Sequence, residues 1–299
     1  MERRHLGYFV AAVEAGSISG AARRLHLSQP SVSQAIQELE RELRTPLFVR
    51  GRKLTLTPAG RALLGPARRT LRGFDSVRAA VEGVGTLATG QLDLAVVPAL
   101  AVDPAVRVVT EFRARYPGVR TRVREAANGV EGFAALRRAE AELLVHDHPA
   151  PYPKHRAVPI ALSELMVVLP PGTSLPEGPV GLAELVRHDV VMGAAAESAV
   201  GTWITVEVAA LQLPPLTIAV DTAHRDAVIP LVLAGAGATV LPEPAARAAE
   251  ALGAVIRPVG FNVPRLAYLY HRIGELSPTA RAFVDLVEEL DGAERVRGS

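Results

Sequence analysis

The stretch from Ser28 to Gln34 carries uncharged side chains that can both donate and accept hydrogen bonds. A serine is a good helix N-cap and a proline is tolerated in the first turn after it, so this stretch predicts the start of a helix. A glutamine amide at such a front can form two hydrogen bonds with an adenine edge in the major groove, and the free N–H groups of the first turn suit a phosphate. An ordinary solvent-exposed face is the alternative interpretation. We therefore expect contacts to duplex DNA from six residues: Ser28, Gln29, Pro30, Ser31, Ser33 and Gln34.

A basic stretch follows shortly after this helix. The apolar runs 47–49 and 54–56 are typical of short strands, and Gly51 between them permits a tight hairpin. Cations at a hairpin tip suit backbone phosphates or a minor groove. The tip of this hairpin carries three of them: Arg50, Arg52 and Lys53.

Three helices are expected to hold the polar front in place. Leu6, Phe9, Val10 and Val13 recur at the three- and four-residue spacing of a buried helix face, and a short helix containing Ala21 and Ala22 follows. A tight connection to the polar helix completes a helix-turn-helix, with the basic hairpin as its wing. The apolar stripe expected in the polar helix consists of Val32, Ile36, Leu39 and Leu43.

A long helix is predicted from Thr57 and Pro58, a cap and a first helical residue, to about residue 87. Its apolar residues recur at alternating threes and fours, as in a coiled-coil seam, and Pro66 predicts a kink or bend. A second copy of the chain is the simplest partner for this stripe, and packing on the chain itself is the alternative. The residues expected in the dimer seam are Leu63, Ala67, Phe74, Val77 and Val81.

Composition divides the chain of 299 residues into a basic front and a mildly acidic remainder. Residues 1–90 hold 14 Arg and Lys against 7 Asp and Glu, a net charge of +7, whereas residues 91–299 hold 19 against 24, a net charge of −5. This asymmetry suggests that the front faces a polyanion. No cysteine occurs, which excludes disulfides and thiolate chemistry and fits a cytoplasmic protein. Neither a signal peptide nor a membrane-spanning run is expected.

From residue 90 onwards, strand-like runs alternate with amphipathic helical runs, which predicts an α/β architecture with parallel sheet. A capped amphipathic helix is expected over residues 277–291. The expected strands lie at 91–97, 121–125, 141–146, 165–170, 189–193, 216–220, 237–242 and 265–272.

Residues 3–65 resemble the DNA-binding domain of LysR-type transcriptional regulators almost without gaps. Small departures from the family pattern occur at Gly20, at Gln34, where arginine is frequent, and at Arg44-Thr45. The matching pieces are Ala21-Ala22, Leu25, Ser28-Gln29-Pro30-Ser31, Ser33, Leu39-Glu40, Leu43, Pro46-Leu47-Phe48, Arg50 and Leu56-Thr57-Pro58-Ala59-Gly60.

This resemblance continues more weakly to the end of the chain and implies a division into three parts. Residues 1–58 would form an all-α winged helix-turn-helix, 59–89 a linker and dimerisation helix, and 90–299 an effector-binding domain with two lobes like those of periplasmic binding proteins. Lobe I would comprise 90–161 and 267–299 and lobe II 162–266, with crossings near Leu162 and Phe261.

Ligands of such sheets bind beyond the carboxyl ends of the strands, in the crevice. That rule predicts an effector site formed by Pro98, Ala99, Leu100, Asn128, His146, Ser198, Thr202 and Thr222. The family often has a hydroxyl residue where this chain has Pro98-Ala99, so we expect a more apolar or differently held ligand than a small carboxylate. Ordinary strand-end loops are the alternative interpretation.

Motifs for catalysis are absent from the sequence, so no enzyme activity and no cofactor is expected. His146, His148 and His155 lie close in the sequence, and the run from His146 to His148 could suggest a metal. No third ligand is fixed by spacing, and histidines at the surface or cleft edge are expected instead. The resemblance implies a regulator that binds operator DNA as a dimer or tetramer, answers to an unknown small molecule, and contacts RNA polymerase if it activates. An effector-independent repressor or architectural protein, or a DNA-binding module fused to an enzyme, are the alternatives.

Overall fold

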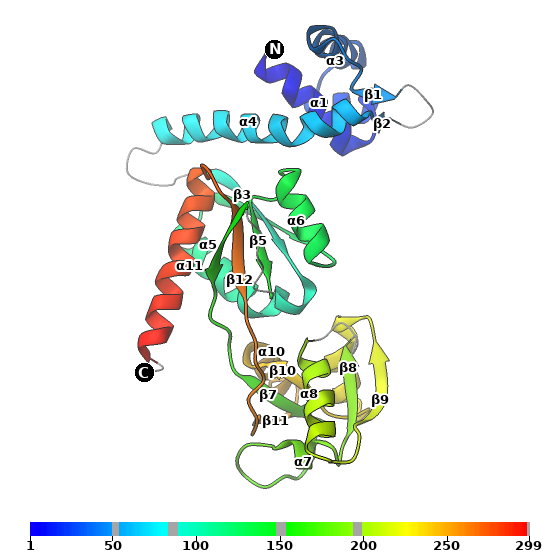
Figure 1. Cartoon of the computed structure of the whole chain (residues 1–299), viewed down its shortest axis with the longest axis vertical. Coiled ribbons are helices and arrows are strands. Elements are labelled where there is room, and N and C mark those ends of the chain that lie inside the picture. Colours follow the sequence, from blue (N-terminus) through cyan, green and yellow to red (C-terminus); the bar gives the residue numbers. More distant parts are fainter. Residues whose placement is uncertain (50–53, 83–88, 148–153, 194–198, 298–299) are drawn as a thin grey trace.

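The computed structural model describes residues 1–49, 54–82, 89–147, 154–193 and 199–297. Arg50, Arg52, Lys53, His148 and Ser198 therefore lie outside the described residues. The molecule has three tiers (Figure 1): a small helical domain, a long helix beneath it, and two stacked α/β lobes. None of the helices within the described ranges combines the length and the apolar character needed to cross a membrane.

The first domain begins with three helices, α1 (Arg3–Ala15), α2 (Ile18–Leu25) and α3 (Gln29–Leu43). Serine caps start the second and third of them, and the cap of the third is the one that the sequence predicts. Ser17 Oγ accepts a hydrogen bond from Gly20 N, and Ser28 Oγ accepts one from Ser31 N. These caps satisfy backbone donors that have no partner within a helix, and so they fix where α2 and α3 begin.

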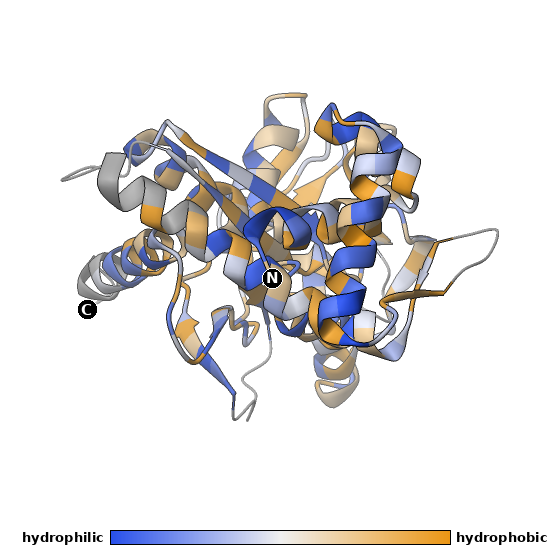
Figure 2. Cartoon of the chain, turned by 90° about the horizontal axis from the view of Figure 1, so that it is seen from above, coloured by the Kyte–Doolittle hydropathy of each residue, from blue (hydrophilic) through white to orange (hydrophobic). Residues whose placement is uncertain are grey.

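The core of the first domain contains the apolar face predicted for each helix. Phe9, Val32 and Leu39 are fully buried, and Phe9 lies against Phe48 with 5.4 Å between ring centroids. Leu43, which the sequence places in this core, is 38% exposed, because α3 ends there at Arg44 in the left-handed conformation, where the chain turns away from the core. Figure 2 shows hydrophilic and hydrophobic residues interleaved along the helices of this domain.

The wing consists of β1 (Phe48–Val49) and β2 (Thr55–Leu56), which pair antiparallel. Its base is held by Glu40 of α3, whose Oε1 accepts from Leu47 N at 2.7 Å and Phe48 N at 3.2 Å. Thr57 then caps the next helix, accepting from Gly60 N at 3.0 Å and donating to Pro46 O at 2.7 Å. These contacts join the wing, α3 and the following helix into one unit.

The long helix α4 spans Pro58–Glu82 without interruption, with Pro66 inside it. Its first half belongs to the core of the first domain, since Leu64 and Ala67 are buried there. Its second half runs above lobe I (Figure 1).

Lobe I is built on a five-stranded mixed sheet of order β4-β3-β5-β12-β6. Strands β3, β4 and β5 are parallel, while β12 is antiparallel to both of its neighbours. The strands are β3 (Gly90–Val96), β4 (Val119–Glu125), β5 (Leu143–His146), β6 (His155–Pro159) and β12 (Tyr268–Arg272), and the helices are α5 (Arg107–Arg115), α6 (Gly129–Arg137) and α11 (Pro278–Arg297).

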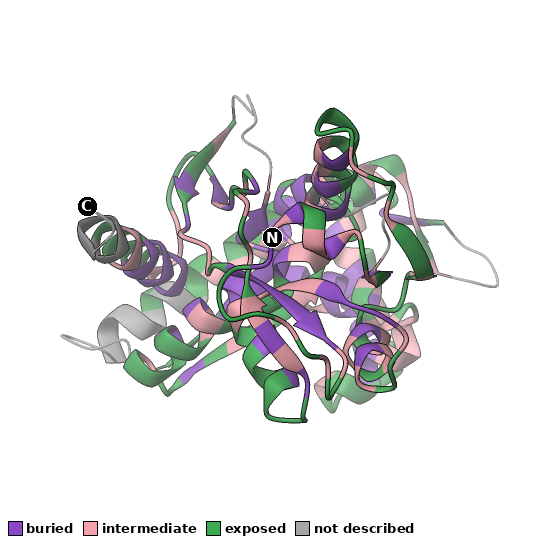
Figure 3. Cartoon of the chain, turned by 90° about the horizontal axis from the view of Figure 1, so that it is seen from below, coloured by how far each residue is buried: buried purple, intermediate pink, exposed green. Residues whose placement is uncertain are grey.

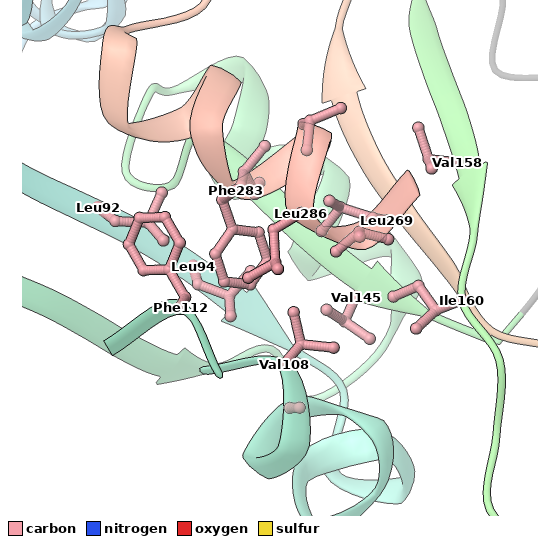
Figure 4. Close-up of a cluster of buried hydrophobic side chains, with 14 of the residues drawn as sticks. Leu92, Leu94, Val108, Phe112, Val145, Val158, Ile160, Leu269, Phe283 and Leu286 are labelled. Carbon is pink, nitrogen blue, oxygen red and sulfur yellow. The ribbon is translucent and has the colours of Figure 1, made fainter. Parts of the chain in front are cut away.

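Helices α5 and α11 cover one face of this sheet and enclose the main core of the lobe (Figure 4). Phe112 of α5 and Phe283 of α11 meet edge to face with 5.1 Å between ring centroids. Leu94 and Leu269 contribute from the sheet and are fully buried. Helix α6 lies on the opposite face, where Phe133 packs against Tyr270.

Lobe II contains a three-stranded antiparallel sheet, β10-β7-β11, and the parallel pair β8-β9, joined by a bridge between Val190 and Ala238. Viewed from this end, buried residues lie mainly in the strands and exposed residues on loops and outer helix faces (Figure 3). Its elements are β7 (Leu165–Leu169), α7 (Leu182–Leu185), β8 (Asp189–Gly193), α8 (Ala199–Ala210), β9 (Thr217–Thr222), α9 (Val228–Leu233), β10 (Thr239–Pro242), α10 (Glu243–Glu250) and β11 (Val255–Pro258).

Two segments connect the lobes, one between β6 and β7 and the other between β11 and β12. Leu162 and Phe261 lie in these segments, which run side by side: Ile160 N donates to Ala267 O at 2.9 Å. The predicted parallel sheet is found for β3, β4 and β5 and for the pair β8-β9, but it does not extend to β12 and β7. Because the chain returns from lobe II to insert β12, that strand enters lobe I in the opposite direction, and β7 is antiparallel to both of its neighbours.

Candidate nucleic-acid interface and ligand sites

The front of α3 presents polar side chains to solvent. Gln29, Pro30, Ser31 and Gln34 are exposed, whereas Ser33 is half-buried and differs from the exposed position expected for it. Ser28 and Ser31 also face each other, with 2.7 Å between their hydroxyl oxygens.

The two glutamines of this front differ in how free their amides are. Gln34 Nε2 donates to Glu38 Oε1 at 3.0 Å, whereas the Gln29 side chain has no hydrogen-bonding partner among the described residues. Gln29 therefore has its full donor and acceptor capacity available, while one of the two N–H donors of Gln34 is already engaged by Glu38.

The residues predicted for the dimer seam divide into two groups. Ala67 is buried in the chain's own first-domain core and Leu63 is half-buried against it. This half of α4 therefore packs on the chain itself, which is the alternative to a dimer seam. Phe74 and Val77 are 49% and 66% exposed, and the guanidinium of Arg3 lies 5.9 Å from the centre of the Phe74 ring. The side chain of Val81 lies outside the described residues.

Helix α4 is tied to lobe I by ion pairs and hydrogen bonds. Arg68 Nη1 lies 3.2 Å from Glu140 Oε1, and Arg72 Nη1 donates to Ala139 O at 2.9 Å. Arg68 also reaches Glu14 of α1 at 3.8 Å, so one guanidinium joins both domains. The sequence shows only that these arginines of α4 are basic. It does not predict their partners in lobe I, because those lie about 70 positions away along the chain.

Two of the predicted effector residues lie next to each other at the N-terminus of α6. Asn128 caps the helix, its Oδ1 accepting from Glu131 N at 3.0 Å. A Cβ placed on Gly129 would lie 2.2 Å from His146 Nε2, so the imidazole lies directly against this turn. His146 is buried at 6% exposure and not at the surface or cleft edge, because β5 lies inside the sheet beneath Phe133.

The other predicted effector residues are spread over both lobes. Pro98, Ala99 and Leu100 form a short helical turn after β3, in which Leu100 is buried in the lobe I core and is unavailable to a ligand. Thr202 is exposed on α8, and Thr222 ends β9 with its hydroxyl accepting from His224 N at 3.0 Å.

A buried polar cluster at the crossings is not predicted by the sequence. Asp103 is 0% exposed, and its carboxylate accepts from Ser163 Oγ at 2.8 Å and Ser163 N at 3.0 Å. Arg265 approaches the same carboxylate at 3.4 Å and donates to Ser163 O at 2.8 Å. We call these three residues the crossover cluster. Burial lowers the pKa of Arg265, and Asp103 opposes that shift.

The crossover cluster joins lobe I to both connecting segments, since each of its members comes from a different one of these three parts of the chain. A cavity of about 630 Å³ lies beside it, lined by the two segments. The only sequence feature that could have pointed to this cluster is that Asp103 lies within an apolar run. A carboxylate that is buried there requires a partner.

The surroundings of two histidines in lobe I lower their pKa values. The pKa of His155 is lowered first by burial and then by Arg272, Arg137 and His271. The pKa of His271 is lowered mainly by burial. The hydrogen bond with Arg272 O is the next largest influence and opposes this shift, whereas Arg156 and Arg281 add to it and Glu288 weakly opposes it.

We expect the stability of lobe I to fall as the pH drops below about 6.5, the ordinary pKa of histidine. The unfolded chain takes up protons there while folded His155 and His271 resist them, so the free energy of unfolding decreases towards acid. Unfolding by urea from about pH 8 to about pH 5 measures the slope. The His155→Gln/His271→Gln variant should have a shallower slope, and a slope equal to that of the wild type would contradict this.

No group of three or more potential ligand side chains within the described part of the chain is arranged to hold a metal ion. His146 Nδ1 lies 3.5 Å from Asp147 Oδ1, and His148 is outside that part of the chain.

Family comparisons match nearly the whole chain. The profile described as "Bacterial regulatory helix-turn-helix protein, lysR family" matches residues 3–61, and the profile described as "LysR substrate binding domain" matches residues 85–291.

Individual relatives and solved structures are similar to the chain over nearly its full length. The chain is 30% identical over 298 residues to the Hca operon transcriptional activator HcaR of Escherichia coli (strain K12), covering 97% of this chain and 98% of that one. The fold is similar to that of CbnR in complex with its target DNA, with a TM-score of 0.64, 24% identity and coverage of 97% and 100%. It is also similar to that of a full-length OxyR variant from Pseudomonas aeruginosa, with a TM-score of 0.68, 19% identity and coverage of 96% and 94%.

Proposed function

The chain belongs to the LysR family of bacterial transcriptional regulators, and from this premise we propose how it recognises operator DNA and how that recognition is controlled. It is a DNA-binding regulator with a helix-turn-helix and an effector-binding domain, not an enzyme. Within it we assign residues 1–58 to DNA binding, 59–89 to the linker, and 90–299 to the effector domain.

In this proposal the front of α3 reads bases in the major groove and the wing grips the backbone. The observation that carries it is the exposed Gln29 amide, which stands beside the capped N-terminus of α3 without a partner among the described residues. Ser31 and the free N–H groups of the first turn would bind a neighbouring phosphate. Arg50, Arg52 and Lys53 of the wing tip would add phosphate contacts.

Two copies of the chain would present two reading helices to a two-fold operator. The exposed half of α4, with Phe74 and Val77, would form the dimer seam, and tetramers would require a second interface. A small molecule held by lobe I near Asn128 and by lobe II near Thr202 and Thr222 would then favour one arrangement of the DNA-binding pairs. The ligand can shift the equilibrium between the two arrangements only if it binds one of them more tightly than the other. The site of action is the cytoplasm, with RNA polymerase as a further partner if the protein activates.

We expect Gln29→Ala to reduce the discrimination between the preferred operator and its single-base variants by about 1–3 kcal/mol, because a bidentate base contact is lost. The preferred operator would first be selected by the wild-type protein from randomised duplexes. Competition binding at constant salt then gives the affinity for each variant sequence.

Gln37→Ala is the matched control, since Gln37 is an exposed glutamine about two turns further along α3. It should leave the sequence preference unchanged. If Gln29→Ala and the wild-type protein show the same sequence preference among the duplexes, Gln29 does not contact bases.

A further inference from the structure

Glu38 lies on α3 one turn beyond Gln34, the last residue of the polar front. Its Oε1 accepts a hydrogen bond from Gln34 Nε2 at 3.0 Å, and the Gln34 side chain is exposed. Side chains four positions apart on a helix face each other, so this contact lasts as long as α3 itself is intact. Among the described residues, Glu38 is the hydrogen-bonding partner that the Gln34 amide has.

The contact determines which end of the Gln34 amide faces which way. A carboxylate has only acceptors, whereas a glutamine amide has a donor nitrogen and an acceptor oxygen. Glu38 therefore holds the amide with its nitrogen towards the carboxylate. The Gln34 oxygen and the second N–H remain available, and they are the one acceptor and one donor that an adenine edge requires.

The carboxylate of Glu38 is itself confined on its other side by α1. Its second oxygen, Oε2, lies 3.5 Å from Nε2 of His5. His5 is buried, and among the described residues neither of its ring nitrogens has a hydrogen-bonding partner, so Glu38 is the charged group that this imidazole faces. The three residues thus form a line from the core of the first domain to its polar front.

Two effects of Glu38 on DNA binding can be separated. Its negative charge repels phosphates, and that effect is the same for every sequence. Its hold on the Gln34 amide acts only on the base pair that Gln34 contacts. A comparison of sequence preference with overall affinity therefore distinguishes a positioning role from a simple effect of charge or of helix stability.

We propose that Glu38 is a positioning residue for sequence recognition, which holds the Gln34 amide in one orientation before DNA binds. This inference rests on the proposed reading of bases by the front of α3. A side chain that is already ordered loses less entropy when it contacts its base. An amide held in one orientation also disfavours a base pair whose donor and acceptor are exchanged. Glu38 therefore adds to specificity without touching DNA.

The test compares variants of the full-length protein on the operator that the wild-type protein selects from randomised duplexes, and on every single-base variant of it. Gln34→Ala identifies the base pair that Gln34 contacts, as the position where the preference falls by at least about fivefold. Glu38→Ala should lower the preference at that same base pair by at least about threefold and leave the other positions unchanged. Its affinity for random duplex should not fall, because a negative charge is removed.

Glu42→Ala is the matched control. Glu42 lies one turn beyond Glu38 on the same helix, is exposed, and pairs with the N-terminal amine of the chain instead of with Gln34. Its substitution removes the same charge and should leave the sequence preference unchanged. In the Gln34→Ala background, adding Glu38→Ala should not reduce the preference any further, because no amide is left to orient.

The role of Glu38 is overturned if Gln34→Ala alters the preference at no base pair, or if Glu38→Ala keeps the wild-type preference at the Gln34 position. It is also overturned if Glu38→Ala lowers the preference as much in the Gln34→Ala background, or weakens binding to all duplexes equally. If the wild-type protein selects no duplex at all, base reading by α3 fails and this inference fails with it.

Discussion

Asp103→Ala is expected to lower the free energy of unfolding of the effector domain by about 3 kcal/mol, because it leaves Arg265 as a largely buried charge without its partner. The same substitution removes the acceptor of both Ser163 hydrogen bonds and so loosens the first crossing. Urea unfolding followed by Trp203 fluorescence measures the loss.

Glu289→Ala provides the control for this experiment. Glu289 pairs with Arg115 at 2.6 Å on the surface, where both partners are solvated and a broken pair costs little. A loss for Asp103→Ala no larger than that for Glu289→Ala would show that the crossover cluster does not stabilise the fold.

Gly60→Ala should have the second largest effect, on the first domain. A Cβ at this position would lie 2.2 Å from Leu47 O and 2.8 Å from Leu56 Cδ2, so the backbone at the base of the wing must move. Leu47 O also accepts from Thr57 N at 3.0 Å, and that bond would be strained together with the cap of α4. We expect a loss of about 2–3 kcal/mol in the free energy of unfolding of this domain and weaker binding to all duplexes.

The matched control is Gly7→Ala. Gly7 lies inside α1, and a Cβ there meets nothing within 4 Å. An alanine should therefore stabilise this helix by about 0.5–1 kcal/mol. If the two variants unfold at the same urea concentration, the close approach of Gly60 to the wing does not contribute to the free energy of unfolding of this domain.

The parts of the fold that sequence patterns predict are those determined by neighbouring residues. Ser17, Ser28 and Thr57 begin their helices because each cap bonds a backbone N–H three positions ahead. The strand run at 189–193 is likewise recognisable as a short block of apolar residues bounded by a charge and a glycine.

The features that the sequence does not predict depend on residues far apart in the chain. Strands β6 and β11 are missed because they are short and include arginine and proline. The direction of β12 follows from its return out of lobe II, which no local pattern encodes.

Periodicity alone also leaves the partner of an apolar stripe open. Ala67 and Phe74 share one heptad-like stripe on α4, yet the first is buried in the chain's own core and the second is half exposed. In the candidate sites, the exposed position of Gln29 follows from helix geometry. The partners of Asp103 and Arg68 do not, because they lie 54 or more positions away.

Helix α4 is anchored to two different bodies, with Leu64 of its first half in the first-domain core and Arg72 near its middle on lobe I. These contacts couple the orientation of lobe I to that of the first domain. We therefore expect a tilt of lobe I to move α3 with it as long as the contacts of Arg68 and Arg72 hold. Salt and competing anions weaken such ion pairs. We therefore expect them to change the distance between the two α3 helices of a dimer, and not only the affinity of each helix for DNA.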